Sequence, residues 1–301
     1  MGSRGEREKG GRLSDGHAFF CLVFLFVFFA FFAVSFTAAQ DLESIRSDLA
    51  SGNTELKRNA LSQIKNLHSE AASRLALSAL SDKDEIVRAT AATAVIFLPK
   101  PDAARVILPL LADKAEFVRR EASFALGEVG DPSATVAITR MLEKDKSRMV
   151  KAAAAAALGK IGDVTAVDAL TAVLKRNPNS ADIFVRRSSA RSVGQIAQMI
   201  RTGRRSNITP ADFLPEKYKE HSPATEPATN GFPVFRVAND VLKRVVGNAK
   251  ESDDTRREAA FALGAIGDYS SATALTALLS SPDVYLAEIC RESLLKLKKP
   301  Q

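Results

Sequence analysis

The sequence predicts an all-helical protein built from stacked pairs of helices. One string recurs as FALGEVGD at residues 124–131, AALGKIGD at 156–163 and FALGAIGD at 261–268. Upstream, the pairs Val87-Arg88, Val118-Arg119, Val150-Lys151 and Val185-Arg186 follow one another at steps of 31, 32 and 35 residues. A period in the thirties is typical of stacked supersecondary units. No segment shows sustained strand alternation, so the expected fold class is an all-α solenoid.

Residues 1–39 precede the repeats and read as an export segment. Residues 18–36 carry no charge and hold nine of the 17 phenylalanines, with Arg4, Arg7, Lys9 and Arg12 before them and the string TAAQ after them. A basic start, an apolar run and small residues are typical of a signal peptide. As a helix, the run would reach roughly 28 Å, close to the thickness of a bilayer core, so an uncleaved membrane anchor is the alternative. Both readings predict an exported protein, periplasmic or extracellular, with membrane contact only through this segment if it is retained.

Residues 41–298 are predicted to form one solenoid of about six repeats plus a terminal half-repeat. We expect a capping helix at about 41–51, a degenerate repeat at 54–80, regular repeats at 84–111, 115–144 and 146–176, a fifth from Asp182, a sixth at 254–281 and the half-repeat at 283–298. Each repeat contains two helices, because apolar residues recur at helical spacing twice per unit. In the third unit the two stripes are Val118, Ala122, Ala125, Leu126 and Val129, then Ala134, Ala137, Ile138, Met141 and Leu142.

The recurring glycines predict where the helices end and how closely they pack. Gly130, Gly162 and Gly267 follow the first helix, where a left-handed cap suits a residue without a β-carbon. The aspartate after each can cap the second helix. Gly127, Gly159 and Gly264 lie inside first helices, where glycine costs about 1 kcal/mol relative to alanine, so a neighbouring helix should pass close by. A phosphate-binding loop is disfavoured, because such a loop should follow a strand.

These residues resemble the HEAT repeat family, in particular the short HEAT-like repeats named after phycobilin lyase subunits. The best match is VRREASFALGEVGDPSATVAITRML at residues 118–142, and the resemblance covers residues 54–298. It implies a right-handed α-α superhelix of the HEAT-like or armadillo type, with second helices lining the concave face. It also implies that Arg119, Arg186 and Arg256 make contacts between repeats. A fold of this kind says much less about function.

One irregular feature interrupts the solenoid. Gly194 and Gly264 lie 70 residues apart, where one repeat should span about 32, so the fifth repeat carries an insertion at about 199–232. Its prolines and its Asn230-Gly231 pair predict an exposed loop, followed by a second helix at 233–246. Loops of this length inside compact repeats are either functional or disordered.

Basic residues near the insertion are the predicted partner-binding site. They are Arg201, Arg204 and Arg205 in the loop and Lys243 and Arg244 on the following helix, with Arg140 on an earlier second helix. Such residues could attract a protein partner with an anionic surface. The alternative is a solvated loop whose charges keep it soluble. The formal net charge of +7 is modest and does not specify nucleic acid, which is not expected as a partner.

No catalytic residue, metal ligand or cofactor site is predicted. The histidines are His17, His68 and His221, and none is followed by glutamate, whereas resemblance to deoxyhypusine hydroxylases would imply paired His-Glu dipeptides. Only Cys290 would remain after cleavage of the export segment, and its place in the helical stripe predicts a buried thiol. The leading hypothesis is therefore an exported, non-enzymatic scaffold that binds a protein partner. The alternative is a HEAT-like enzyme or accessory, resembling phycobilin lyases or, less closely, deoxyhypusine hydroxylases.

Overall fold

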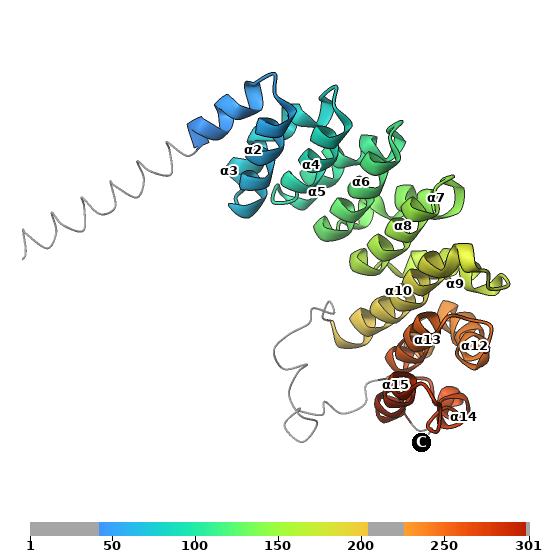
Figure 1. Ribbon diagram of the computed structural model, residues 1–301. Coiled ribbons are helices and arrows are strands. Elements are labelled where there is room, and N and C mark those ends of the chain that lie inside the picture. The colour runs from blue at the N-terminus through green and yellow to red at the C-terminus, as the bar shows by residue number, and fades with distance from the viewer. Residues whose placement is uncertain (1–41, 204–225, 299–301) are drawn as a thin grey trace, which may run out of the picture.

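The computed structural model describes residues 42–203 and 226–298, in which helices follow one another in pairs (Figure 1). A helical segment over residues 42–50 comes first. The first helices of the pairs are α2 (Thr54–Asn66), α4 (Glu85–Ala94), α6 (Glu116–Val129), α8 (Arg148–Ile161), α10 (Ile183–Thr202), α13 (Asp253–Ile266) and the terminal α15 (Val284–Leu295). The second helices are α3 (Glu70–Leu75), α5 (Lys100–Ile107), α7 (Thr135–Lys144), α9 (Val167–Lys175), α12 (Val234–Gly247) and α14 (Ala272–Thr276).

Short 3₁₀ helices occupy many of the connections and helix ends. They are η1 (Leu77–Ser81), η2 (Leu108–Ala112), η3 (Pro132–Ala134), η4 (Val164–Ala166), η5 (Ser180–Asp182) and η8 (Tyr269–Ser271). Within the described ranges the β structure is a single isolated bridge between Asp268 and Lys298. The predicted all-helical repeat fold is therefore confirmed.

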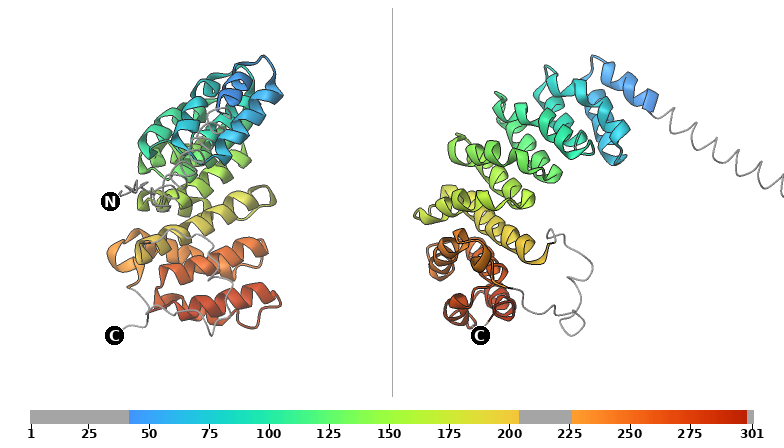
Figure 2. Two further views of the ribbon diagram at one scale, coloured as in Figure 1. Left: turned by 90° about the vertical axis from the view of Figure 1, so that its left-hand side faces the viewer. Right: turned by 180° about the vertical axis from the view of Figure 1, so that it is seen from behind.

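The helix pairs stack into an arc in which first helices pack on first helices (Figures 1 and 2). From α8 onward, the first helices α8, α10, α13 and α15 lie on the inner side of the arc, and the second helices α9, α12 and α14 lie on the outer side. The expectation that second helices line the concave face is wrong for this part of the chain. Small residues let the first helices approach more closely than the second helices do, so the stack curves toward them.

The close approach of the first helices is visible at their interior glycines. A β-carbon built on Gly127 would lie 2.8 Å from the Cα of Ala157 in the next first helix, and one on Gly264 would lie 2.7 Å from the Cα of Ser293. Both distances are too short for real β-carbons, and at Gly264 the side chain of Ser293 lies closer still, at 2.6 Å. The predicted reason for glycine inside a helix is confirmed, because a larger residue would push adjacent repeats apart.

The Gly-Asp pairs end one helix and start the next. Gly130, Gly162 and Gly267 have φ of 62°, 79° and 77°, in the left-handed region that favours glycine. The following aspartates each accept a hydrogen bond from the backbone N–H two residues on, at 2.9 Å for Asp131, 3.0 Å for Asp163 and 2.9 Å for Asp268. Both predicted roles of the pair are confirmed.

Arginines at one position of the repeat tie each unit to the next. The guanidinium of Arg88 donates to both carboxylate oxygens of Asp113, at 2.7 and 2.9 Å, and that of Arg119 donates to Asp145 at 2.7 and 3.1 Å. A third pair joins Arg186 to Glu251. Each acidic partner lies in the loop before the next first helix, so the contacts between repeats implied for Arg119 and Arg186 are confirmed. Arg256 on α13 donates to the carbonyl oxygen of Val246 in α12 at 3.1 Å, so it also makes a contact between repeats, with a backbone oxygen of the preceding repeat as the acceptor.

The fifth repeat remains intact around its insertion. α10 continues to Thr202, and the described chain resumes before the short helix α11 (Ala228–Gly231), where Ala228 and Thr229 are buried. The second helix predicted at 233–246 is α12, and its Phe235 is fully buried. Cys290 on α15 is buried, as predicted. None of the described helices is both long and apolar enough to cross a membrane, and the predicted export segment at 1–39 lies outside the described residues.

Candidate functional site

Arg201, one of the predicted partner-binding residues, is engaged by its own chain. Its guanidinium donates to the backbone oxygens of Gly264 at 3.1 Å and Ala265 at 2.8 Å, near the end of α13. It also donates to the carbonyl oxygens of Glu226 at 3.1 Å and Lys296 at 3.2 Å. Burial lowers the pKa of this guanidinium from its ordinary value. The last carbonyls of a helix have no intrahelical partner, so Arg201 stabilises the ends of two stacked helices.

The other predicted basic residues do not form one cluster with Arg201. Arg204 and Arg205 lie outside the described residues. Lys243 on α12 pairs with Asp240 at 2.9 Å, and Arg244 is exposed on the same helix. Arg140 is exposed on α7, which is separated from α12 by α9. Nothing in the described residues joins Arg140 to Lys243 and Arg244, so a shared role for them stays a prediction.

The inner face from α8 to α15 carries the other chemically distinctive surface. On α8 the core side is made by Val150, Ala154, Leu158 and Ile161, all buried. Met149, Ala152, Ala156 and Lys160 follow the opposite side at helical spacing. This side is turned away from the second helices, and equivalent positions on the stacked first helices continue it.

Exposed apolar side chains recur at one position of this face. Met149 on α8, Phe184 on α10 and Tyr285 on α15 are 45%, 56% and 72% exposed. Each lies one residue before the position of the repeated valine, and α13 has Asp254 there. In the earlier repeats the same position holds Ile86 and Phe117. A row of large exposed apolar side chains is typical of a surface that binds another molecule.

Arginine side chains lie over the aromatic rings of this row. The guanidinium carbon of Arg187 is 5.9 Å from the ring centre of Phe184, and that of Arg257 is 5.2 Å from the ring centre of Tyr285. Arg120 lies over Phe117 in the same way at 4.9 Å. Such pairs hold a planar cation against an aromatic face and present both to a ligand.

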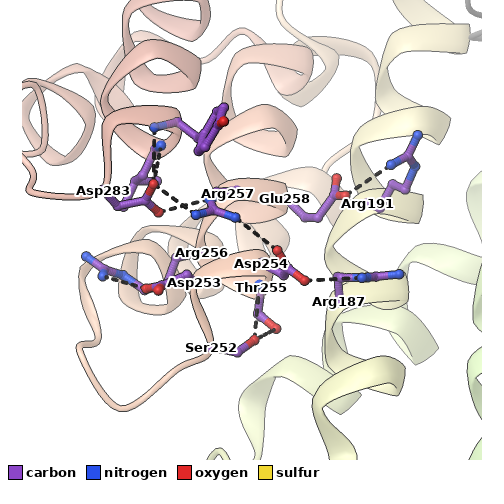
Figure 3. Close-up of polar contacts among 12 residues, drawn as sticks. Arg187, Arg191, Ser252, Asp253, Asp254, Thr255, Arg256, Arg257, Glu258 and Asp283 are labelled. Carbon is purple, nitrogen blue, oxygen red and sulfur yellow. Dashed lines mark hydrogen bonds and ion pairs between the residues drawn. The ribbon is translucent and has the colours of Figure 1, made fainter.

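Ion pairs connect these arginines into a chain across three helices, as Figure 3 shows. Asp254 on α13 accepts hydrogen bonds from Arg187 at 3.2 Å and from Arg257 at 3.1 Å. Arg257 in turn donates to both carboxylate oxygens of Asp283, at 2.9 and 3.0 Å. These hydrogen bonds lower the pKa of Asp283 below its ordinary value. These ion pairs fix the positions of the Arg187 and Arg257 guanidinium groups in the unbound protein.

A further pair lies beside this chain of contacts. Arg191 on α10 donates to Glu258 on α13 at 3.0 Å (Figure 3). Burial raises the pKa of Glu258 above its ordinary value, although Arg191 opposes the shift. The inner face therefore combines exposed rings, oriented arginines and carboxylates, which suits recognition of a peptide chain with mixed chemistry.

The sequence carries a signal for this face that differs from a cluster of basic residues. Aligning the residue before each repeated valine puts Ile86, Phe117, Met149, Phe184 and Tyr285 in one column. Apolar residues at helical spacing are expected in the core, and only the structure shows that this column projects from it. In the described residues no group of three His, Cys, Asp or Glu side chains could hold a metal ion.

The stacked pairs and the continuous inner face define an α-solenoid. Models of the HEAT repeats match residues 42–124 and 116–194, and a model of the PBS lyase HEAT-like repeat matches residues 255–281. The chain belongs to the HEAT repeat proteins. A comparison with curated proteins gives no match.

The comparison with solved structures gives matches at low sequence identity. A crystal structure of an engineered protein is 19% identical, with a TM-score of 0.53 over 86% of this chain and 69% of that one. The complex of CpcE and CpcF of phycocyanin lyase from Nostoc sp. PCC7120 is 20% identical, with a TM-score of 0.47 over 85% of this chain and 94% of that one. Human deoxyhypusine hydroxylase in complex with glycerol is 17% identical, with a TM-score of 0.34 over 87% and 98%.

Proposed function

We propose that this chain is an exported, non-enzymatic scaffold that binds a protein partner across the inner face of α8, α10, α13 and α15. The observation that carries the proposal is the row of exposed Met149, Phe184 and Tyr285 at equivalent positions of stacked helices. Solenoids offer an extended curved surface, and rigid aromatic side chains and arginines are the residues that contribute most at protein interfaces.

The ion pairs of this face support binding rather than stability alone. Exposed ion pairs contribute little to folding, typically about 0–1 kcal/mol. The pairs of Arg187 with Asp254 and of Arg191 with Glu258 nevertheless orient two guanidinium groups, and that of Arg187 lies over the exposed ring of Phe184. Groups that are already oriented cost less entropy when a partner binds.

Site-specific crosslinking tests the location of the partner. A photoreactive amino acid in place of Phe184 should form an adduct with one protein in cells that produce the chain. The matched control places the same amino acid at Val136, which is 77% exposed on α7. An adduct from the Val136 position that equals the one from Phe184, or no adduct from Phe184, would refute the inner face as the binding surface.

The export and the absence of catalysis are separate parts of the proposal. The basic start and apolar run of residues 1–39 support export, and fractionation of cells with a tagged chain measures it. Recovery of the full-length chain from the soluble cytoplasmic fraction would contradict export. A bound chromophore or a stoichiometric metal in the purified chain, seen by absorption or metal analysis, would instead support the HEAT-like enzyme or accessory.

A further inference from the structure

We propose that one exposed side of the terminal helix α15 is a dimerisation surface, on which α15 of a second copy of this chain packs in the antiparallel direction. The surface, here called the end stripe, consists of Val284, Glu288, Arg291 and Leu295. Residues at this spacing follow one side of a helix. The proposal goes beyond the scaffold function proposed above, because the end stripe lies on a different side of α15 from Tyr285 and takes a different partner.

The end stripe lies on the side of α15 that faces away from α13. Residues of the two helices correspond at a step of 31 positions, so Leu263 matches Leu294 and Gly264 matches Leu295. A β-carbon on Gly264 would point at Ser293 of α15, the next first helix. Leu295 therefore points to the place where a further first helix would lie.

A leucine at this position excludes the close packing used inside the stack. The equivalent position is a glycine in α6, α8, α10 and α13, and a β-carbon there would come within 3.0 Å of an atom of the next first helix. These glycines are Gly127, Gly159, Gly194 and Gly264. An occupant of the end stripe must therefore meet α15 through side chains instead of through close backbone contact.

The end stripe is complementary to its own reverse. Val284 and Leu295 at its ends are 75% and 65% exposed, and Glu288 and Arg291 between them have side chains that are 59% and 57% exposed. When two such helices pack side by side in opposite directions, Val284 of each copy lies opposite Leu295 of the other. Glu288 of each copy then lies opposite Arg291 of the other. Reciprocal contacts of this kind are those that a two-fold axis requires.

The charges of the end stripe favour this direction. Glu288 and Arg291 pair with each other within one copy, so the stripe carries no net charge, although the formal net charge of the chain is +7. In the antiparallel dimer this pair is kept, and each guanidinium also faces the carboxylate of the second copy. The five N–H donors of a guanidinium can serve both. A parallel arrangement would instead place like charges opposite each other, which is unfavourable.

The size of the end stripe predicts a weak dimer. α15 has 12 residues, so it is about 18 Å long. One side of such a helix is smaller than the roughly 800 Å² that each partner buries in a standard interface. We expect a dissociation constant on the order of tens of micromolar. The dimer should weaken as salt rises, because its central contacts are between exposed charges.

Charge reversal with rescue tests the proposal on the purified full chain. Sedimentation velocity over a range of protein concentrations measures the dissociation constant of the dimer. Glu288→Arg and Arg291→Glu each give an end stripe with two like charges, so each variant alone should dimerise at least about tenfold more weakly. An equimolar mixture of the two variants should regain the affinity of the unchanged chain, because their end stripes are oppositely charged. A variant that fails to fold cannot give this rescue.

A pair at the other end of the solenoid provides the matched control. Glu55 and Arg58 form the same kind of exposed pair, three positions apart on α2. Glu55→Arg should leave the dissociation constant of the dimer unchanged. The dimerisation surface is refuted if the unchanged chain stays monomeric at concentrations well above the expected dissociation constant, or if Glu55→Arg and Glu288→Arg weaken the dimer equally. Charge reversals that weaken the dimer without rescue in the mixture would overturn the two-fold arrangement.

Disulfide crosslinking tests the antiparallel direction. All chains carry Cys21→Ser, which leaves the buried Cys290 as the only native cysteine. Copies with Val284→Cys, mixed with copies with Leu295→Cys, should form a disulfide-linked dimer on mild oxidation. Copies with Val284→Cys alone should not, because their cysteines would lie about 16 Å apart along the helices. Equal crosslinking in the mixture and in the Val284→Cys variant alone would overturn the antiparallel register.

Discussion

Arg186 on α10 and Glu251 in front of α13 form a buried ion pair across 65 positions of sequence, and their side chains are 3% and 2% exposed. The equivalent pairs of Arg88 with Asp113 and Arg119 with Asp145 span only 25 and 26 positions. The difference is close to the length of the insertion. The pair therefore restores the register of the repeat after the chain has left the stack and returned.

Breaking this pair should be costly. Arg186→Met leaves the carboxylate of Glu251 buried without its partner, and loss of one member of a buried pair typically costs about 3–5 kcal/mol. Urea unfolding followed by circular dichroism measures the change. Arg58→Met is the control, because Arg58 pairs with Glu55 at the surface and should contribute at most about 1 kcal/mol. Similar losses of unfolding free energy in both variants would show that burial does not make the pair of Arg186 with Glu251 more stabilising than an exposed pair.

The equivalent pair in an earlier repeat should make stability depend on pH in the acid range. Hydrogen bonds from Arg88 lower the pKa of Asp113 below its ordinary value. A lowered folded-state pKa means that the stabilisation is fully present above the unfolded value of about 4 and is lost as pH falls through the folded pKa. Asp113→Asn should lower the free energy of unfolding at neutral pH and flatten its decline below about pH 4. An unchanged acid slope in a urea series at several pH values would contradict this.

Gly162 should tolerate no β-branched residue. Its φ of 79° disfavours any L side chain, and a β-carbon there would also meet the side chain of Met199. We expect Gly162→Val to lower the free energy of unfolding by about 1–3 kcal/mol. Gly247→Val is the matched control, because nothing lies within 4 Å of a β-carbon at that position. Equal melting temperatures of the two variants would mean that α8 ends elsewhere in solution.

Substitution of Arg201 should lower stability, unlike substitution of its sequence neighbours Arg204 and Arg205. Arg201→Ser removes the donor to backbone oxygens at the ends of α13 and α15, so the melting temperature should fall. Arg204→Ser with Arg205→Ser should leave the melting temperature unchanged and, if the predicted loop patch binds an anionic partner, should reduce the salt dependence of that binding. A melting temperature unaffected by Arg201→Ser would exclude its role at the helix ends.

The boundary of the insertion can be found by replacement. A Gly-Ser linker in place of residues 204–225 should leave the free energy of unfolding within about 1 kcal/mol, because closure entropy changes slowly with loop length. A linker that replaces residues 204–231 also removes the buried Ala228 and the contact between Arg201 and Glu226. Calorimetry should show a clearly lower stability for the longer replacement. Equal stability would mean that α11 contributes nothing to the stack.

The fold was predictable because its determinants are local and repeated. Gly130, Gly162 and Gly267 mark helix ends through a backbone conformation that other residues avoid. The spacing of the apolar stripes fixes the two helices of each unit, and repetition makes each signal count several times. The direction of curvature was not predictable in this way. It depends on which side of the stack packs more closely. The family resemblance implies second helices on the concave face, whereas the interior glycines place the closest packing between first helices.

The candidate site was predictable only in part. A cluster of basic letters such as Arg201, Arg204 and Arg205 is easy to find, but sequence does not show that Arg201 reaches carbonyl groups 63 and 64 positions away. The apolar column at Met149 and Phe184 was present in the alignment of repeats. Its exposure follows from the arrangement of whole helices, which no single stripe reveals.

The glycines at the first-helix contacts also determine how the arc responds to force. With the Cα of Ala262 already against Gly194 and that of Ser293 against Gly264, the inner side from α10 to α15 cannot be compressed further, whereas the outer helices α9, α12 and α14 pack less closely. A tighter curvature would make backbone atoms of adjacent first helices collide. The arc can therefore straighten more easily than it can close. The spacing between adjacent helices of the inner face therefore has a fixed lower limit. A partner on this face must match that spacing, because the protein cannot compress to fit a shorter one.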